Sequence, residues 1–293
     1  MKKGIRRALS VLMLAIFLYS GGKLLFIRHR YRTSEKVYRD AATAFTRPSA
    51  TNAPGAAPAP ATAPSPAAAA DSGSHGAAQD REPDADTPLL APQLAPIQVD
   101  FDALTKANSE IVGWLYCEDS VINYPVVWGR DNNFYLGRDY LGNPDPSGTI
   151  FINAANQRNF SDANVIMYGH NMQNMTMFAS LRYWLDQAYY EEHPVMWLLT
   201  PRQDYRIELF AAYTTPADSD TYTIIPAQGE ELSGYLQRVC ARSKIYAPFE
   251  LNENAKYVVL STCAYDYELA RNVLHGMLVP LDSAGGVPKH SPA

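Results

Sequence analysis

Three residues in the second half of this chain have the types and the sequence context for covalent thiol chemistry. Cys263 ends the apolar run of residues 258–263, so it lies where a strand is expected to end. Arg271 follows eight residues later, on what we expect to be the next strand. A guanidinium keeps its charge and can stabilise a thiolate or a developing oxyanion. His170 ends a second apolar run, residues 165–170, in a Gly-His step. Together these residues suggest a cysteine nucleophile, a histidine acid–base and a charge-stabilising arginine.

Each of the three residues also has a simpler structural interpretation. A cysteine after an apolar strand is often a buried packing residue, a histidine after glycine a turn residue, and an arginine on a strand a solvated side chain. The joint pattern favours catalysis. Papain-like and NlpC-type peptidases place the cysteine before the histidine, whereas His170 precedes Cys263 by 93 residues. The chain order therefore disfavours the commonest thiol hydrolases.

The remaining chemistry-bearing residues give weaker signals. Cys117 and Cys240 lie in apolar contexts and are interpreted as small buried hydrophobes, with a Cys117–Cys240 disulfide left open. His275 is a candidate alternative base, but it alternates with Val273 and Met277 along a strand. We therefore expect it to face away from or flank the core without a catalytic role. No cluster of His, Cys, Asp or Glu has metal-ligand spacing, so we expect neither a metal nor another cofactor.

Many short strands with a few inserted helices predict a β-barrel or sandwich rather than a βαβ repeat. Strands are expected over residues 111–116, 121–128, 149–152, 164–168, 195–199, 205–213, 257–262 and 272–279. Pro125 predicts an edge position or a bulge for the second of these. Helices are expected over residues 101–107, capped by Asp100, over 176–190, and over 230–243 directly before the cysteine strand.

The N-terminal third differs from this domain in composition. Residues 1–32 combine flanking Lys and Arg with an apolar run, residues 8–27, that is long enough to span a membrane. We interpret them as a cytoplasmic tip and an uncleaved signal anchor, with a cleaved signal peptide as the alternative. Residues 33–96 are assigned to a disordered tether because of their Ala/Pro-rich stretch. The catalytic domain is assigned to residues 97–285 and a tail to residues 286–293.

Charge divides at the same boundary. Residues 97–293 contain 13 Lys and Arg against 23 Asp and Glu, whereas residues 1–96 contain 12 against 7. An acidic domain without a stripe of basic and aromatic side chains argues against nucleic acid as a partner. We expect instead a catalytic domain outside the cytoplasmic membrane, held there by a single-pass anchor whose N-terminus lies in the cytoplasm.

The stretches around the three candidate residues are similar to those of a known family. They are Leu260-Ser261-Thr262-Cys263 with Arg271, and Tyr168-Gly169-His170-Asn171, with further likeness over residues 126–136, 148–152, 177–181 and 275–279 and at Tyr265. In these stretches the domain resembles sortases, the cysteine transpeptidases of Gram-positive surfaces, and class B among them. The expected helix over residues 230–243 is similar to one that class B adds before the cysteine strand. Two positions depart from the pattern: Asn153 replaces an acidic residue and Trp128 replaces the usual Gln.

The resemblance implies a mainly β, α+β fold: a closed sortase-type barrel of about eight strands, with an N-terminal helix and an inserted helix before the cysteine strand. It implies that Cys263 attacks the Thr carbonyl of a C-terminal sorting signal and forms a thioester. His170 would protonate the leaving amine and deprotonate the incoming one. Arg271, with the backbone N–H of Ala264, would stabilise the oxyanion. The residues implied at the substrate groove are Asn132, Leu136, Tyr168, Ser261, Thr262, Ala264 and Tyr222.

The implied partners are secreted proteins that bear a sorting signal, an amine of a peptidoglycan precursor, and the membrane through the N-terminal helix. Three alternatives stay open. They are a pilus-type sortase that joins subunits through Lys, a thiol peptidase that only hydrolyses, and a non-catalytic wall-binding module with a vestigial site. Class resemblance favours an Asn-Pro-x-Thr or related signal over Leu-Pro-x-Thr, and the accepting amine stays open.

Overall fold

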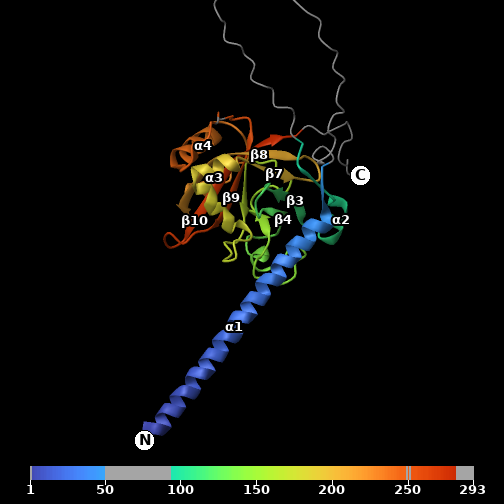
Figure 1. Ribbon diagram of the computed structural model, residues 1–293. Coiled ribbons are helices and arrows are strands. Elements are labelled where there is room, and N and C mark those ends of the chain that lie inside the picture. The colour runs from blue at the N-terminus through green and yellow to red at the C-terminus, as the bar shows by residue number, and fades with distance from the viewer. Residues whose placement is uncertain (1, 50–93, 249, 251, 282–293) are drawn as a thin grey trace, which may run out of the picture.

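The computed structural model of the protein describes residues 2–49, 94–248, 250 and 252–281. Its centre is a closed barrel of eight strands in the order β10-β8-β7-β3-β4-β5-β6-β9 (Figure 1). The strands are β3 (Ile111–Tyr116), β4 (Asn123–Trp128), β5 (Ile150–Ile152), β6 (Asn164–Tyr168), β7 (Val195–Leu199), β8 (Tyr205–Pro216), β9 (Lys256–Cys263) and β10 (Ala270–Pro280). Neighbours pair antiparallel except β4 with β5 and β6 with β9, which are parallel. The expected closed, mainly β barrel is confirmed.

Side-chain alternation along the strands separates the barrel interior from a second core on its outer face. In β9, Val258 and Leu260 belong to the interior cluster, whereas Tyr257 and Val259 belong to the outer one. Helix α4 (Glu230–Arg242), expected from its spacing, covers the outer cluster with four buried apolar side chains. Because successive side chains point to opposite faces, Cys263 lies on the outer face with Tyr257 and Val259.

The strand that contains Pro125 is not an edge strand, which corrects one expectation. β4 pairs with β3 from Asn123 to Val127, but its parallel pairing with β5 starts only at Val126. Pro125 precedes that pairing by one residue, so its missing N–H lies outside the ladder that β4 forms with β5. The register irregularity lies in the facing strand, between Ile111 and Gly113.

The segment expected as one helix over residues 176–190 forms two short helices. They are a 3₁₀ helix, η3 (Phe178–Leu185), and α3 (Gln187–Glu192). Asp186 separates them because its backbone is extended and its side chain accepts from the N–H of Tyr189, which caps α3. Helix α2 (Phe101–Ala107) begins at the expected Asp100 cap. Two further 3₁₀ turns, η2 (Phe134–Gly137) and η4 (Asp220–Tyr222), adjoin the site described below.

The N-terminal helix is longer than expected, which corrects the start of the tether at residue 33. α1 (Lys2–Phe45) continues because Ser34, Tyr38 and Ala41, at helical spacing, are buried against the barrel. Next, β1 (Thr46–Pro48) pairs antiparallel with β2 (Ile97–Val99). The chain is therefore packed on the domain before the Ala/Pro-rich stretch begins. Residues 50–93 of the expected tether, and the tail over 286–293, lie outside the described residues.

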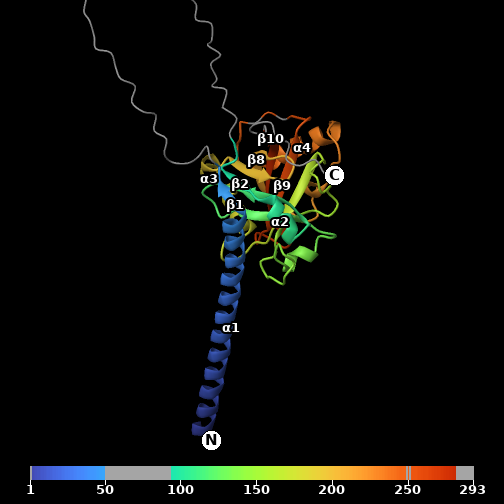
Figure 2. The same cartoon turned by 90° about the vertical axis from the view of Figure 1, so that its right-hand side faces the viewer.

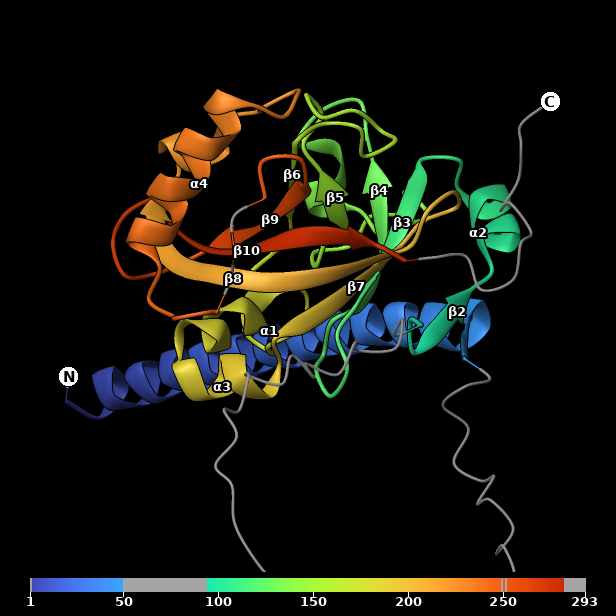
Figure 3. The same cartoon turned by 90° about the horizontal axis from the view of Figure 1, so that it is seen from above.

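The N-terminal half of α1 projects away from the barrel (Figures 1 and 2). By length and composition this helix can cross a membrane, and none of its apolar window is buried. A signal sequence near an N-terminus has the same length and composition. The observation therefore fits both an uncleaved signal anchor and a cleaved signal peptide. Figure 3 shows α4 and α1 on different sides of the barrel, with α4 beside β9 and β10.

Candidate active site

Strand pairing on the outer face of the barrel brings Cys263 and Arg271 together. Cys263, the last residue of β9, pairs with Arg271 on β10. On its other side Arg271 pairs with Thr215 of β8. Directly opposed residues in antiparallel strands have Cβ atoms about 4.5–5.5 Å apart. The three residues therefore form one row across the sheet, with the cysteine at one end.

The parallel pairing of β6 with β9 brings His170 alongside the cysteine. This pairing extends to Ser261, and just beyond it the Gly169 N–H donates to the Ser261 carbonyl at 3.2 Å. The Asn171 side-chain amide then donates to the carbonyl of Cys263 at 2.7 Å. His170 lies between these two hydrogen bonds, so the chain on both sides of it is held to the cysteine strand.

The imidazole of His170 is held by the segment around η2. Its Nε2 lies 2.7 Å from the carbonyl oxygen of Leu136. A carbonyl oxygen only accepts, so in this arrangement Nε2 is assigned the proton. Gly148, at φ +58°, packs against the ring: a Cβ there would lie 3.1 Å from His170 Cδ2 and 2.8 Å from the Leu136 oxygen. Only a residue without a side chain fits under the histidine at this backbone angle.

The three candidate catalytic residues are each partly exposed, so solvent and substrate can reach them. One guanidinium nitrogen of Arg271, Nη1, donates to the carbonyl of Ala270 at 3.0 Å. The backbone N–H of Ala264 donates to the same oxygen at 2.8 Å. This corrects the expectation that the Ala264 N–H is directed at an oxyanion, because here it closes the β9–β10 loop.

Two tyrosines cover β9 beside the cysteine. The Tyr222 and Ser261 hydroxyl oxygens are 2.8 Å apart, and the rings of Tyr168 and Tyr222 stack at 6.3 Å between centroids. Burial raises the pKa of both phenols, so both stay neutral at physiological pH. Tyr168, Ser261 and Tyr222 thus form one connected wall beside the cysteine strand.

The side-chain amide of Asn153 links one more of the expected groove residues, Asn132, to Tyr168. Asn153 donates to the Tyr168 hydroxyl at 2.9 Å and accepts from Asn132 at 3.4 Å. This neutral residue stands where an acidic one was expected. Leu136 is 38% exposed. Thr262 is a correction: strand alternation turns it to the opposite face from Ser261, where its side chain is buried.

Other chemistry-bearing residues lie outside this group. His275 is buried beneath α4 and stacks on Tyr213 at 5.3 Å, where burial lowers its pKa to about 3. Cys117 is buried as expected, which raises its pKa to about 11, but Cys240 is exposed, because it lies beside the buried stripe of α4. Both are free, as is Cys263, so the disulfide left open is not formed. Within the described ranges, no three or more His, Cys, Asp or Glu side chains converge where a metal ion fits.

Three contacts of the site were not expected. Thr215 extends the row that contains Arg271, which only the register of β8 reveals. Leu136 holds His170 through its backbone carbonyl, and a backbone atom has no signature in the sequence. Asn171 directly follows His170 in the sequence, and its side chain donates to the Cys263 carbonyl. The only sign of this contact in the sequence is an amide side chain next to the histidine.

No protein-family model matches the chain, but comparisons with individual proteins identify relatives by sequence and by fold. Sortase B of Listeria monocytogenes is 28% identical over 280 residues, which cover 95% of this chain and 98% of that protein. A solved sortase B from Bacillus anthracis is 35% identical, with a TM-score of 0.55, over 61% of this chain and 84% of that one. The Staphylococcus aureus sortase B–substrate complex is 27% identical, with a TM-score of 0.59, over 62% and 85%. With the same barrel and a site assembled on its outer face, the chain belongs to the class B sortases.

Proposed function

We propose that this protein is a membrane-anchored transpeptidase that cleaves a C-terminal sorting signal after Thr and transfers the new carboxyl end to a cell-wall amine. One observation supports this above the others. The antiparallel pair Cys263–Arg271 and the parallel pair β6–β9 bring a thiol, a guanidinium and an imidazole to one edge of the barrel. A solved complex of Staphylococcus aureus sortase B with substrate and one of a sortase B with triglycine fit the same reaction class.

In the first half-reaction, the thiolate of Cys263 attacks the carbonyl carbon of the Thr, so a C–S bond forms and an electron pair moves to the oxygen. Arg271 stabilises this oxyanion with guanidinium N–H groups other than the one bound to Ala270. The intermediate collapses, the C–N bond after Thr breaks, and His170 gives its proton to the leaving amine. The products are a thioester on Cys263 and the free C-terminal fragment.

In the second half-reaction, an acceptor amine attacks the thioester carbonyl and passes its proton to His170. The C–S bond breaks, the thiolate returns, and an amide joins the protein to the acceptor. Since the carbonyl of Leu136 occupies Nε2 of the histidine, Nδ1 is the nitrogen left for both proton transfers. The imidazole ends the cycle protonated, as it began.

The substrate groove in this proposal is lined by Tyr168, Ser261 and Tyr222, which form one wall beside the cysteine. Asn132, which Asn153 links to Tyr168, and Leu136 lie on the segment that also holds the histidine. Thr262 is left out because its side chain is buried on the other face. An Asn-Pro-x-Thr or related signal is the proposed ligand of this groove.

The proposed location is the outer face of the cytoplasmic membrane, with α1 as a single-pass anchor and its N-terminus inside. α1 is long and apolar enough for one crossing. Basic residues flank both ends of its apolar run, so loop charge alone orients it weakly. The orientation rests on the chemistry, because sorting signals and wall amines meet outside the cell.

The test uses the full chain in lipid nanodiscs, because α1 packs on the barrel. The protein is incubated with peptides containing Asn-Pro-x-Thr, Ser-Pro-x-Thr or Leu-Pro-x-Thr, with and without an added amine, and its intact mass is measured beside a Cys263→Ala variant. We expect a mass gain equal to the peptide fragment ending at Thr, absent from Cys263→Ala. Added amine should remove this adduct and yield a new amide.

Other outcomes identify the alternatives. Product that is only the free acid, whatever amine is added, identifies a thiol peptidase. Covalent ladders of a protein substrate joined through Lys identify a pilus-type sortase. A folded protein with a reactive Cys263 thiol that forms no adduct and cleaves no peptide of the panel would contradict transpeptidation and favour the binding module.

A further inference from the structure

The last turns of α1 are fastened to the segment that packs against His170. The Ser34 hydroxyl donates to the carboxylate of Asp145 at 2.5 Å. The Tyr38 hydroxyl donates to the carbonyl of Gly148 and lies 2.9 Å from the Thr149 hydroxyl. Ser34 and Tyr38 are only 3% and 5% exposed. Residues 145–149 are thus held to α1 by buried hydrogen bonds, which are costly to leave unmade.

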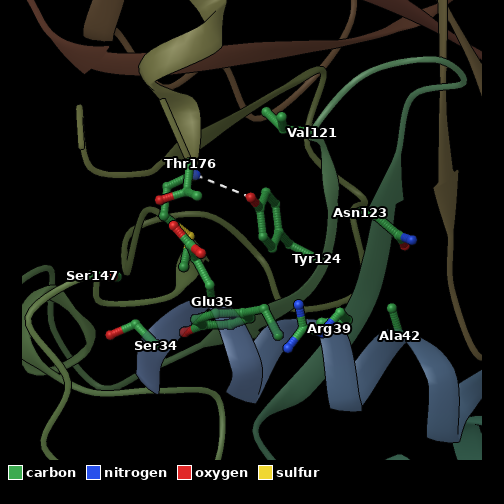
Figure 4. A pocket seen from close by; sticks show the side chains of 11 residues that line it. Ser34, Glu35, Arg39, Ala42, Val121, Asn123, Tyr124, Ser147 and Thr176 are labelled. Atoms are coloured by element: carbon green, nitrogen blue, oxygen red, sulfur yellow. Dashed lines mark hydrogen bonds between the residues drawn. The ribbon is translucent and has the colours of Figure 1, made fainter. Parts of the chain in front are cut away.

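The same helix also contacts the loop that follows His170. The Asn174 amide donates to the carboxylate of Glu35 at 2.6 Å, and the Thr176 hydroxyl donates to Asn174 at 2.9 Å. Figure 4 shows Ser34 and Glu35 on α1, with Ser147 and Thr176 around the same pocket. This pocket of about 400 Å³ is lined by residues of α1 and of both segments.

Both segments continue directly to the histidine. The N–H groups of Thr149 and Asp145 donate to the carbonyls of Tyr135 and Gly137, at 3.1 and 2.9 Å, which ties residues 145–149 to η2. η2 in turn supplies the Leu136 carbonyl that binds Nε2 of His170.

The loop after the histidine is closed in a similar way. The N–H of Phe178 donates to the His170 carbonyl at 3.0 Å, and the N–H of Met177 donates to the Tyr124 hydroxyl at 3.1 Å (Figure 4). Tyr124 packs edge-to-face on Tyr38 at 5.5 Å. α1 therefore contacts the supports of His170 on both sides of the residue.

We propose that α1 is part of the catalytic apparatus as well as an anchor, and that Tyr38 is a positioning residue for His170. This inference rests on the proposed function, which gives His170 its catalytic role. Tyr38 acts through Gly148 and Leu136: its hydroxyl holds the backbone that packs under the imidazole and binds Nε2. Removing that hydroxyl loosens the imidazole and leaves the Cys263–Arg271 row in place.

The experiment compares Tyr38→Phe with the unmodified full chain in nanodiscs. We expect kcat for transpeptidation to fall about tenfold, because small misplacements of a catalytic group have large kinetic effects, with KM for the peptide within about twofold. Tyr257→Phe is the matched control. Like Tyr38, Tyr257 is a buried tyrosine whose hydroxyl donates to a backbone carbonyl, in this case that of Asn252. Tyr257 lies at the opposite end of β9 from Cys263. The control is expected to keep kcat within about twofold.

A second readout follows the imidazole itself. The chain has six histidines, so NMR of ¹³C-labelled histidine rings, assigned with a His170→Gln variant, resolves the His170 signal. Tyr38→Phe should shift that signal and Tyr257→Phe should not. Ser34→Ala, which removes one contact of the same set, provides a milder variant if Tyr38→Phe fails to fold.

The inference requires both effects. A kcat equal to that of the Tyr257→Phe control, or a fall in kcat without a shift of the His170 signal, overturns it. Failure of the proposed function gives a different result: the unmodified chain forms no acyl-enzyme with any peptide. The NMR comparison then decides the positioning of His170 without any activity.

Discussion

Cys263 and Arg271 face each other because two antiparallel strands are in a particular register, and His170 joins them because a parallel strand ends beside the cysteine. Side-chain hydrogen bonds then refine the arrangement, from Asn171 to the Cys263 carbonyl and from the His170 ring to Leu136. At the scale of single residues, environment separates two histidines with the same chemistry. His170 is partly exposed and bound to a carbonyl, whereas His275 is buried beneath α4.

His275 should make the stability of the protein sensitive to acid. Burial lowers its pKa to about 3 from an ordinary 6.5, so below pH 6.5 the unfolded chain takes up a proton that the folded chain excludes. Its contribution to stability is complete above pH 6.5 and is lost as the pH falls toward 3, by up to about 1.4 kcal/mol per pH unit. In His275→Phe, whose ring can stack on Tyr213, the free energy of unfolding should fall less steeply between pH 6 and 4.

Urea denaturation of both proteins at a series of pH values measures this slope, and carboxylates contribute equally to the two. Transpeptidation by His275→Phe should match the unmodified chain, since the residue lies outside the site. Identical slopes would show that His275 is not the group that takes up the proton.

The three proposed catalytic residues were singled out in the sequence because each one lies at or next to the end of an apolar strand. Thr262 was misassigned for a physical reason: a likeness over Leu260–Cys263 does not say which side chains face the groove, and the two-residue period of a strand turns it inward. The bond from Leu136 to His170 uses a backbone carbonyl. Such a contact depends on the fold alone, so no residue type predicts it.

At the scale of elements, the segment from η2 to β5 does more than connect two strands. It supplies the acceptor for His170 through Leu136, packs Gly148 against the ring, and is held by α1 through Asp145 and Gly148. Most helices and strands were expected within a few residues, because their apolar periods are clear. The inner position of β4 and the break at Asp186 were not, since both depend on strand partners and a local cap.

Gly148→Ala should lower both stability and activity. A Cβ at this position would lie 2.7 Å from the Tyr135 oxygen and 2.8 Å from the Leu136 oxygen, at φ +58°. We expect a loss of roughly 2–3 kcal/mol in the free energy of unfolding, since strain at positive φ adds to the steric conflict. kcat should fall as well, because the Leu136 carbonyl and the His170 ring must both shift to make room for the new methyl group.

Gly142→Ala is the matched control. Gly142 also has a positive φ, +86°, but a Cβ there meets nothing within 4 Å. This variant should lose only about 1–2 kcal/mol from backbone strain and keep its kcat. If the two variants lost the same stability and both kept full activity, the packing of Gly148 under the histidine would have no catalytic consequence.

At the scale of the whole molecule, α1 belongs to the catalytic domain from about Tyr31 onward, where its side chains begin to contact the barrel. The sequence contained part of this information, because Ser34, Tyr38 and Ala41 recur at helical spacing. The tether was instead started at residue 33, directly after the apolar and basic segment of residues 1–32, although the Ala/Pro-rich stretch begins only after α1 has ended. The pairing of β1 with β2 joins residues about fifty positions apart, and such non-local pairing has no local signal.

Removing α1 should therefore destabilise the barrel. A fragment of residues 94–293 loses the burial of Tyr38 and Ala41, the hydrogen bonds of Ser34 and Tyr38, and the β1–β2 pair. A fragment of residues 28–293 loses only the apolar run and the residues before it. We expect the shorter fragment to lose roughly 2–5 kcal/mol in its free energy of unfolding relative to the longer one. Urea denaturation of the two fragments measures the difference, and equal midpoints would show that α1 rests on the barrel without stabilising it.

The continuity of α1 also has a consequence for the proposed function, because it fixes where the barrel lies relative to a membrane that the helix spans. At 1.5 Å per residue, its 44 residues form one helix about 66 Å long, and the part from about Tyr31 onward packs on the barrel. If the apolar run spans a bilayer, a domain on a flexible linker could reach any point within the linker's length of the membrane. A domain packed on a continuous helix stays at a nearly constant distance from the membrane. Under the proposed function, encounters with sorting-signal proteins and wall precursors held in the same membrane then become two-dimensional. Their frequency follows the number of molecules per area of membrane, in place of their concentration in solution.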